Sequence, residues 1–217
     1  MLSPAHAGGV RAELLLNPRA PFPLARQFQN EGLTLGEVFT FASGLYFRGK
    51  LIYARRFAES AAGDVVRVIS SNAGLLDPSL VIGPRQLIAF GTTDIDVTDP
   101  KYHKPLRRDA QTLARQMGNT GTAILLGSIA TPKYRDVLLK VFGQRLVFPG
   151  EFVGRGDMSR GALLLRAAKA GEELSYTSVL GAVLTGKRAV CAGSIPLAVS
   201  KWQQGESNIG KIGDTFR

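Results

Sequence analysis

Short apolar runs alternate with longer stretches of helical periodicity along most of this chain. The runs lie at residues 12–16, 65–69, 122–126 and 145–148, and each ends in small or polar residues. Because they are too short for typical helices and are bounded by turn-forming residues, we interpret all four as buried strands.

Segments with apolar residues three and four positions apart separate these runs. In the segment 47–61, Leu51, Ala54, Phe57 and Ala58 form an apolar stripe, and the cationic residues Arg48, Lys50, Arg55 and Arg56 are placed on the other faces. Helices are predicted at 25–30, 36–41, 47–61, 101–117, 134–142 and 157–170. Residues 75–100, with three prolines, are predicted to be irregular.

Strands that alternate with helices are typical of a parallel sheet with right-handed crossovers. We therefore predict an α/β fold, a three-layer sandwich with a four-stranded parallel sheet. It would occupy residues 1–171 as one domain. Residues 172–217 would be a C-terminal extension that packs on the core and ends in a basic tail.

The charge of the chain indicates a protein that attracts polyanions rather than an ordinary globular domain. Lys and Arg number 27 against 17 Asp and Glu, for a net charge of +10. Nucleic acid, DNA above all, is the partner such a field favours. An anionic membrane surface, a ribosomal neighbour and a merely basic enzyme are the alternatives.

The scarce cysteine and histidine narrow the chemistry. One cysteine, Cys191, and two histidines, His6 and His103, make a zinc site or a serine–histidine triad improbable, and His6 is expected in a frayed N-terminus. No apolar run approaches the roughly 20 residues of a membrane span, and no secretory signal is evident. We expect a cytoplasmic monomer that uses no metal or cofactor.

In open parallel sheets, ligands bind beyond the carboxyl ends of the strands. This rule selects the segments 17–19, 70–72, 127–128 and 149–160. The last is the densest: Arg155 and Arg160 suit phosphate, and Glu151 supplies a carboxylate at the strand end. Asp157 is either a helix cap or a catalyst, and Glu151 is equally compatible with a surface turn.

Asn17 is the second catalytic candidate, since an amide at a strand end can position a water molecule; an Asx turn is the alternative. Tyr46 is a candidate for base stacking, and Lys133 and Tyr134 for contacts to a phosphate and a base face, unless they are merely solvated and packed. Ser70 and Asn72 either contact a ligand or shape their turn. The complete set of DNA- or base-binding candidates is Pro18, Arg19, Tyr46, Arg48, Ser70, Asn72, Ser128, Lys133, Tyr134, Arg155 and Arg160.

Two motifs carry a family resemblance. A predicted strand followed by the Ser-x-x-x-Gly-Leu-Leu-x-Pro pattern of residues 70–78, after the segment Ser43-Gly44-Leu45-Tyr46, resembles distant members of the uracil-DNA glycosylase-like superfamily. The sequence Leu15-Leu16-Asn17-Pro18 is similar to the first motif of that superfamily. The likeness spans residues 11–171.

The resemblance implies a DNA glycosylase that extrudes one nucleotide and hydrolyses its N-glycosidic bond, leaving an abasic site. The later histidine motif of the superfamily is absent, and Glu151 with the Gly-Arg-Gly-Asp stretch of residues 154–157 stands there instead. This departure favours a modified or non-standard base, such as the glucosylated hydroxymethylcytosine removed in antiphage defence. The alternatives are a non-catalytic nucleic-acid-binding protein and a nucleotide-processing or base-exchange enzyme.

Overall fold

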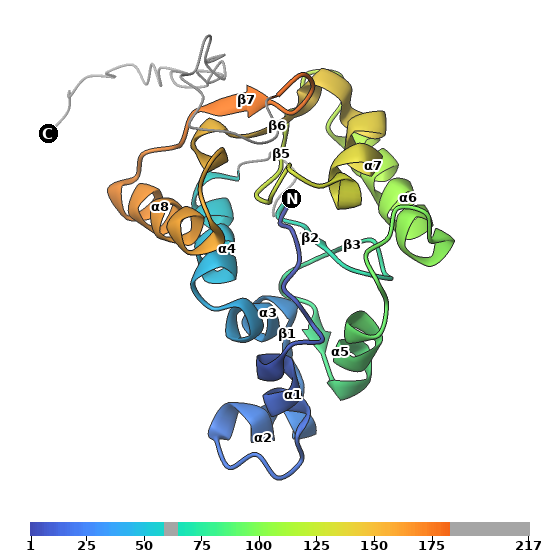
Figure 1. Ribbon diagram of the computed structural model, residues 1–217, viewed down its shortest axis with the longest axis vertical. Coiled ribbons are helices and arrows are strands. Elements are labelled where there is room, and N and C mark those ends of the chain that lie inside the picture. Colours follow the sequence, from blue (N-terminus) through green and yellow to red (C-terminus); the bar gives the residue numbers. More distant parts are fainter. Residues whose placement is uncertain (59–64, 183–217) are drawn as a thin grey trace, which may run out of the picture.

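The structure is a computed structural model, and it describes residues 1–58 and 65–182. Helices and very short strands make up the described chain (Figure 1). The helices are α1 (Val10–Leu16), α2 (Pro23–Asn30), α3 (Leu35–Ser43), α4 (Leu45–Phe57), α5 (Pro84–Gly91), α6 (Pro100–Gln116), α7 (Pro132–Phe142) and α8 (Asp157–Ala170), with the 3₁₀ helices η1 (Gly143–Arg145) and η2 (Gly150–Phe152). The strands are β1 (Leu33–Thr34), β2 (Val68–Ile69), β3 (Leu75–Leu76), β4 (Val81–Ile82), β5 (Ala123–Ile124), β6 (Leu146–Pro149) and β7 (Tyr176–Ser178).

The predicted four-stranded parallel sheet is wrong. The strands form two antiparallel pairs, β1 with β4 and β2 with β3, and a three-stranded sheet in the order β5-β6-β7. Strand β5 pairs with β6 in parallel, whereas β7 is antiparallel to β6. The fold is therefore mixed α/β with small sheets, and it is predominantly helical.

The first predicted strand, residues 12–16, is part of helix α1. Ala12 and Leu15 are buried, while Leu14 between them is 43% exposed. This spacing is a helical stripe rather than a strand alternation. The run contains no β-branched residue, and a five-residue apolar run of this kind fits either element by length alone.

Residues 1–3 lie in the centre of the molecule instead of fraying (Figure 1). Leu2 makes parallel bridges to Val68 and to Leu126, and its side chain is completely buried. The Leu2 N–H donates to the Arg67 carbonyl at 2.8 Å, and the Ser3 N–H donates to the Leu126 carbonyl at 3.1 Å. The segment thus joins the β2-β3 pair to the β5-β6-β7 sheet.

The other three predicted strands overlap β2, β5 and β6, and the six predicted helices overlap α2, α3, α4, α6, α7 and α8. Residues 75–100, predicted to be irregular, contain β3, β4 and α5. Pro84 is the first residue of α5, where a missing backbone N–H costs no hydrogen bond. The prediction of an irregular segment was wrong here because it treated Pro84 only as a residue that interrupts helices.

Helices α4 and α8 pack with their backbones in contact. A Cβ added at Gly161 would lie 2.8 Å from the Cα of Tyr46, and one added at Gly49 would lie 2.7 Å from the Gly161 carbonyl oxygen. Near the other end of both helices, Gly171 faces Arg56. The helices therefore run in the same direction, which places the first turns of α4 and α8 side by side (Figure 1).

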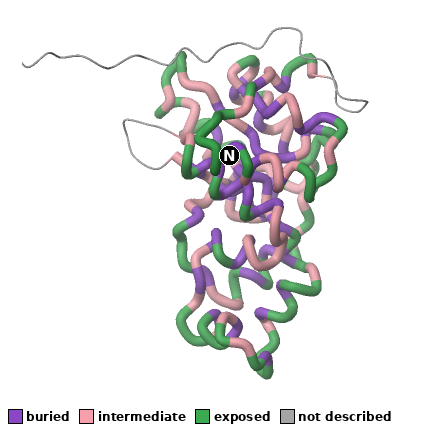
Figure 2. The backbone as a smooth tube through the Cα atoms, turned by 90° about the vertical axis from the view of Figure 1, so that its left-hand side faces the viewer, coloured by how far each residue is buried: buried purple, intermediate pink, exposed green. Residues whose placement is uncertain are grey.

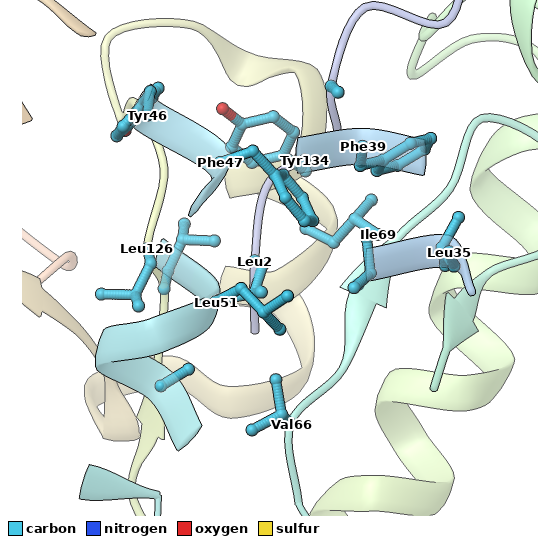
Figure 3. Packing of buried hydrophobic residues seen from close by; sticks show 14 of the residues in the cluster. Leu2, Leu35, Phe39, Tyr46, Phe47, Leu51, Val66, Ile69, Leu126 and Tyr134 are labelled. Atoms are coloured by element: carbon cyan, nitrogen blue, oxygen red, sulfur yellow. The ribbon is translucent and has the colours of Figure 1, made fainter. Parts of the chain in front are cut away.

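Buried residues occur in all parts of the described chain and face its interior (Figure 2). Around Leu2 they include Phe47 and Leu51 of α4, Ile69 of β2 and Leu126 after β5 (Figure 3). Residues 172–182 of the predicted extension supply β7 to the sheet, while the basic tail within residues 183–217 lies outside the described residues. In the described part of the chain, every helix is too short or too polar to cross a bilayer.

Candidate functional site

Three of the four predicted strand-end segments come to one edge of the strands, where the carboxyl ends of neighbouring parallel segments lie. Residues 70–72 follow β2, residues 127–128 follow β5 and its bridge, and residues 149–160 begin at the end of β6. Ser3 follows Leu2 at the same edge, because Leu2 runs parallel to both neighbours. The first two turns of α4 and the first turns of α7 and α8 supply the remaining side chains there.

The fourth segment is not part of this edge. Asn17 ends α1, which with α2 forms the lower end of the molecule in Figure 1. The Asn17 side-chain oxygen accepts a hydrogen bond from the Arg19 backbone N–H at 2.9 Å, which is an Asx turn. Asn17, Pro18 and Arg19 are exposed, and the structure shows the turn alternative for the amide.

The most unusual side chain at the edge is Lys50 of α4. It was expected on a polar face of its helix, but only 1% of its surface is exposed. Its Nζ donates to the Ser3 carbonyl at 2.6 Å and to the Ser3 Oγ at 2.9 Å. The amine also lies 4.4 Å from the Tyr46 ring centroid and 5.0 Å from that of Phe47.

Burial lowers the pKa of the Lys50 amine to about 7; the carboxylate of Asp157 opposes this shift, and the guanidinium of Arg160 adds to it. Among the described residues, no carboxylate lies within ion-pair distance of the amine. The amine therefore changes its charge near neutral pH, which an exposed lysine does not do.

Tyr134, in the first turn of α7, connects Lys50 with the loop after β5. Burial raises the pKa of the Tyr134 phenol, while hydrogen bonding with the Ser3 hydroxyl and with the Ser128 backbone opposes the rise. Ser3 thus contacts both the amine of Lys50 and the phenol of Tyr134. The three side chains form one hydrogen-bonded group drawn from the N-terminal segment, α4 and α7.

Tyr46, in the first turn of α4, is packed rather than available for stacking. Lys50 lies over its ring, and the ring of Phe152 meets it edge-on with centroids 6.5 Å apart. Its hydroxyl is buried without a hydrogen-bond partner in the described structure. Burial raises the pKa of this phenol, and the nearby Arg160 opposes the rise. The predicted base contact of Tyr46 would need its ring to be uncovered.

Asp157 and Arg160 form the outer part of the site on the first turn of α8. The Arg160 Nη1 lies 3.4 Å from the Asp157 Oδ1, and its Nε donates to the Phe152 carbonyl at 3.1 Å. The Asp157 side chain is 68% exposed, and Gly156 rather than Asp157 occupies the cap position. We name Ser3, Tyr46, Lys50, Tyr134, Asp157 and Arg160 the strand-end cluster.

Two predicted residues of the same loop point elsewhere. Glu151 lies in η2, where its Oε2 is buried without a partner, and its charge acts on Tyr53, which is not part of the cluster. The Arg155 Nη1 donates to the Ser159 hydroxyl at 3.1 Å, while its Nε is buried without a partner. Asp157, not Glu151, is thus the carboxylate that acts electrostatically on the cluster.

A cavity of about 190 Å³ is lined in part by residues 4–8, which follow Ser3. Ser71, Lys133 and Asp94 contribute polar groups to its wall, and Phe39 and Phe90 contribute apolar ones. The Ser71 hydroxyl donates to the Phe90 carbonyl at 2.8 Å. Lys133 precedes Tyr134, so the cavity and the cluster share the start of α7.

The remaining candidates hold the local backbone or remain in solvent. The Ser70 hydroxyl donates to the Gly74 carbonyl at 3.0 Å, and the Asn72 amide donates to the Ala89 carbonyl at 3.0 Å. Ser70 therefore has the turn-shaping contact that was the alternative to ligand binding, whereas the Asn72 amide connects its turn to helix α5. Arg48 is exposed on α4, and the Ser128 hydroxyl accepts from the Ala130 N–H at 3.3 Å.

Sequence reasoning missed Ser3 and Lys50. The available signal was the spacing of Tyr46, Lys50, Tyr53 and Phe57, which places Lys50 on the buried face of its helix. No sequence signal marked Ser3. Residues 1–3 are too few to show a periodicity, and the bridges of Leu2 join segments that are distant in the sequence. Within the described residues, no three side chains of His, Cys, Asp or Glu gather as a metal site would require.

Comparison of the chain with protein-family models, with curated proteins and with solved structures gives no match. The functional argument therefore depends on the chemistry of the cluster itself. That chemistry is a buried amine and two buried phenols beside an ion pair, in which the Asp157 carboxylate is exposed and the Arg160 guanidinium is largely buried.

Proposed function

We propose that this protein is a DNA glycosylase that hydrolyses the N-glycosidic bond of one modified or non-standard nucleotide. The observation that carries the proposal is the position of Asp157. Its carboxylate is exposed at the edge where the strands end, and it acts electrostatically on Tyr46, Lys50 and Tyr134. A single accessible carboxylate above a buried proton-exchanging network is a suitable arrangement for glycosidic hydrolysis.

The departure of a base leaves positive charge on the sugar. In this proposal, Asp157 stabilises that charge or accepts the proton of the attacking water. Arg160 and the free N–H groups at the start of α8 bind the adjacent phosphate. The cavity lined by Lys133 and residues 4–8 receives the extruded base.

The charge of the chain supports a polyanionic substrate. Exposed cations that form no ion pair with another described residue lie on α4, at Arg48, Arg55 and Arg56, and on α6, at Lys101, Lys104 and Arg107. Both helices flank the central segment in Figure 1. Such cations add sequence-independent affinity for phosphates, which decreases as salt rises.

The test is an abasic-site assay on single- and double-stranded oligonucleotides that contain ordinary cytosine, uracil or glucosylated hydroxymethylcytosine. We expect strand cleavage after alkali for at least one modified base, and a loss of at least about 100-fold for Asp157→Asn. Asp136→Asn is the matched control, because Asp136 also pairs with an arginine, Arg135, at 2.7 Å, and its side chain is 43% exposed.

The result is decisive in both directions. Base release by the wild type and by Asp136→Asn, but not by Asp157→Asn, supports the proposal. If the wild type binds these DNAs and releases no base from any of them, the protein is a binding module. If it releases base while Asp157→Asn does so equally well, the assignment of the carboxylate is wrong.

A further inference from the structure

We propose that Ser3 and Lys50 form a nucleophile–base pair that cleaves carboxylic esters, an activity that does not depend on the proposed function. The inference rests on one juxtaposition: a serine hydroxyl hydrogen-bonded to a buried lysine amine that has no carboxylate partner within the described residues. Serine–lysine pairs are an established alternative to the serine–histidine arrangement in nucleophilic catalysis.

Two short contacts hold the Lys50 amine against Ser3. The Lys50 Nζ contacts the Ser3 Oγ at 2.9 Å and the Ser3 carbonyl at 2.6 Å. A neutral amine donates one hydrogen to the carbonyl and keeps its lone pair for the hydroxyl proton. The second contact therefore orients the base, as a third group does in a catalytic triad.

Groups from each neighbouring element determine the charge of the amine. On α4 it faces the rings of Tyr46 and Phe47, and on α8 it experiences the carboxylate of Asp157 and the guanidinium of Arg160. On α7, Tyr134 contacts the same hydroxyl. Burial outweighs these charges and gives the amine a pKa of about 7, so that a large fraction is unprotonated at neutral pH.

The reaction balances with water as the second reactant. The Ser3 Oγ bonds to the ester carbonyl carbon while its proton passes to Lys50, and Arg160 stabilises the negative oxygen that forms. As the C–O bond of the ester breaks, Lys50 returns the proton to the leaving alkoxide. Water then attacks the acyl-serine with Lys50 again accepting the proton, which releases the carboxylic acid and restores the serine.

Gly127 packs closely against the serine, because a side chain at this position would begin 2.9 Å from the Ser3 Oγ. Gly127 and Arg160 also line a small cavity of about 20 Å³, together with Phe148 and Phe152. Ser3 is itself 5% exposed, so a reagent reaches its hydroxyl only when the side chains around this cavity move.

The experiment uses the full chain with its affinity tag at the carboxyl end, so that the pairing of residues 1–3 is unchanged. The protein is treated with a fluorophosphonate probe, and the labelled residue is located by mass spectrometry between pH 6 and pH 9. Hydrolysis of p-nitrophenyl acetate is measured alongside. Ser159→Ala is the matched control, because Ser159 also has a cationic partner, Arg155.

We expect the probe to label Ser3, with a rate that rises through a midpoint near pH 7. Labelling and hydrolysis should be lost in Ser3→Ala, should fall at least tenfold in folded Lys50→Met, and should be unchanged in Ser159→Ala. Should Lys50→Met fail to fold, Lys50→Arg supplies the test, because an arginine stays protonated and cannot act as the base. A folded wild type that the probe does not label at any pH would overturn the proposal, as would labelling that survives Lys50→Arg.

Discussion

Helix α4 carries two buried polar groups three residues apart, and they belong to networks of opposite character. Tyr53 belongs to a chain of hydrogen bonds in which each group is satisfied. The Leu174 N–H donates to the Tyr53 hydroxyl at 2.8 Å, the two hydroxyls of Tyr53 and Tyr176 are 2.7 Å apart, and Tyr176 donates to Glu173 at 2.7 Å. This tyrosine network connects α4 to β7.

The strand-end cluster has none of this completeness. Lys50 is an amine without a carboxylate partner in the described structure, and the Tyr46 hydroxyl has no hydrogen-bond partner there. Burial raises the pKa of Tyr53 to about 12, which keeps it neutral, whereas burial brings Lys50 into the range where it titrates. The tyrosine network stabilises the fold. The strand-end cluster retains polar groups that lack a carboxylate or hydrogen-bond partner in the described structure, as ligand and reaction sites do.

The largest effect we expect is a loss of stability at the contact between α4 and α8, the two helices that carry Lys50 and Asp157. Gly161→Ala places a methyl group 2.8 Å from the Cα of Tyr46, so α4 and α8 must move apart. We predict a loss of about 3 kcal/mol in the free energy of unfolding, measured by urea denaturation. Gly156→Ala is the control, since its added Cβ meets no atom within 4 Å. Equal stabilities of the two variants would mean that the helices do not touch at Gly161.

The second prediction concerns pH. The pKa of Lys50 is about 7 in the folded state, against 10.5 for an ordinary lysine, so the unfolded chain binds the extra proton between these values. Stability from this group must rise with pH above 7 and is lost as the pH falls toward 7. Relative to Lys50→Met, the wild type should gain about 2 kcal/mol between pH 7.5 and pH 9 in denaturation experiments.

The difference from Lys50→Met removes the contributions of other groups, including the buried amine of Met1, whose pKa is also lowered. The upper limit of pH 9 avoids the ionisation of tyrosines in the unfolded chain. A difference between the two proteins that is constant across this range would show that Lys50 keeps its charge at all of these pH values.

The third prediction compares the two tyrosines directly. Tyr53→Phe leaves the Leu174 N–H without its partner and removes the hydrogen bond between the two tyrosine hydroxyls, and it should cost about 1.5 kcal/mol. Tyr46→Phe removes a hydroxyl that has no partner, so it should cost nothing or stabilise the fold by up to about 1 kcal/mol. Thermal unfolding of both variants checks the pair, and the reverse order would contradict the contrast between the networks.

The smallest expected effect concerns DNA binding near the cluster. Lys133 begins α7 beside Tyr134, and Lys140 lies in the last turn of the same helix; both are exposed. Lys133→Gln should weaken DNA binding about threefold and lower the salt slope by about one, while Lys140→Gln should change neither. Fluorescence anisotropy at several salt concentrations measures both quantities. Equal effects would place the DNA elsewhere on the molecule.

The sequence predicted local elements better than their assembly. Helices at α4, α6, α7 and α8 followed from apolar spacing, and the segments at β2, β5 and β6 followed from short apolar runs. Residues 12–16 were misassigned because Ala12 and Leu15 satisfy a helical stripe that a five-residue run does not reveal. The predicted sheet was therefore wrong as well. Residues 12–16 are helical, and Leu2, rather than this segment, forms the bridges to Val68 and Leu126.

The candidate site shows the same division. Tyr134, Asp157 and Arg160 were found because they begin helices after strand ends, a local signal. Lys50 was placed on the wrong face of its helix, because a cation is ordinarily assumed to be solvated. Asn17 was given a role that required a strand before it, whereas it ends helix α1. Ser3 could not be predicted, because its role depends on which distant segments lie beside residues 1–3.

The position of residues 1–3 has a consequence for how the protein folds. Met1 donates a hydrogen bond to the carbonyl of Ile124, a residue 123 positions away in the chain. Closing a loop of that length has an entropic cost before any contact compensates for it, and contacts of this kind slow folding. Because Leu2 bridges Val68 of β2 and Leu126 after β5, we expect the assembly of Ser3 with Lys50 to be among the last events of folding.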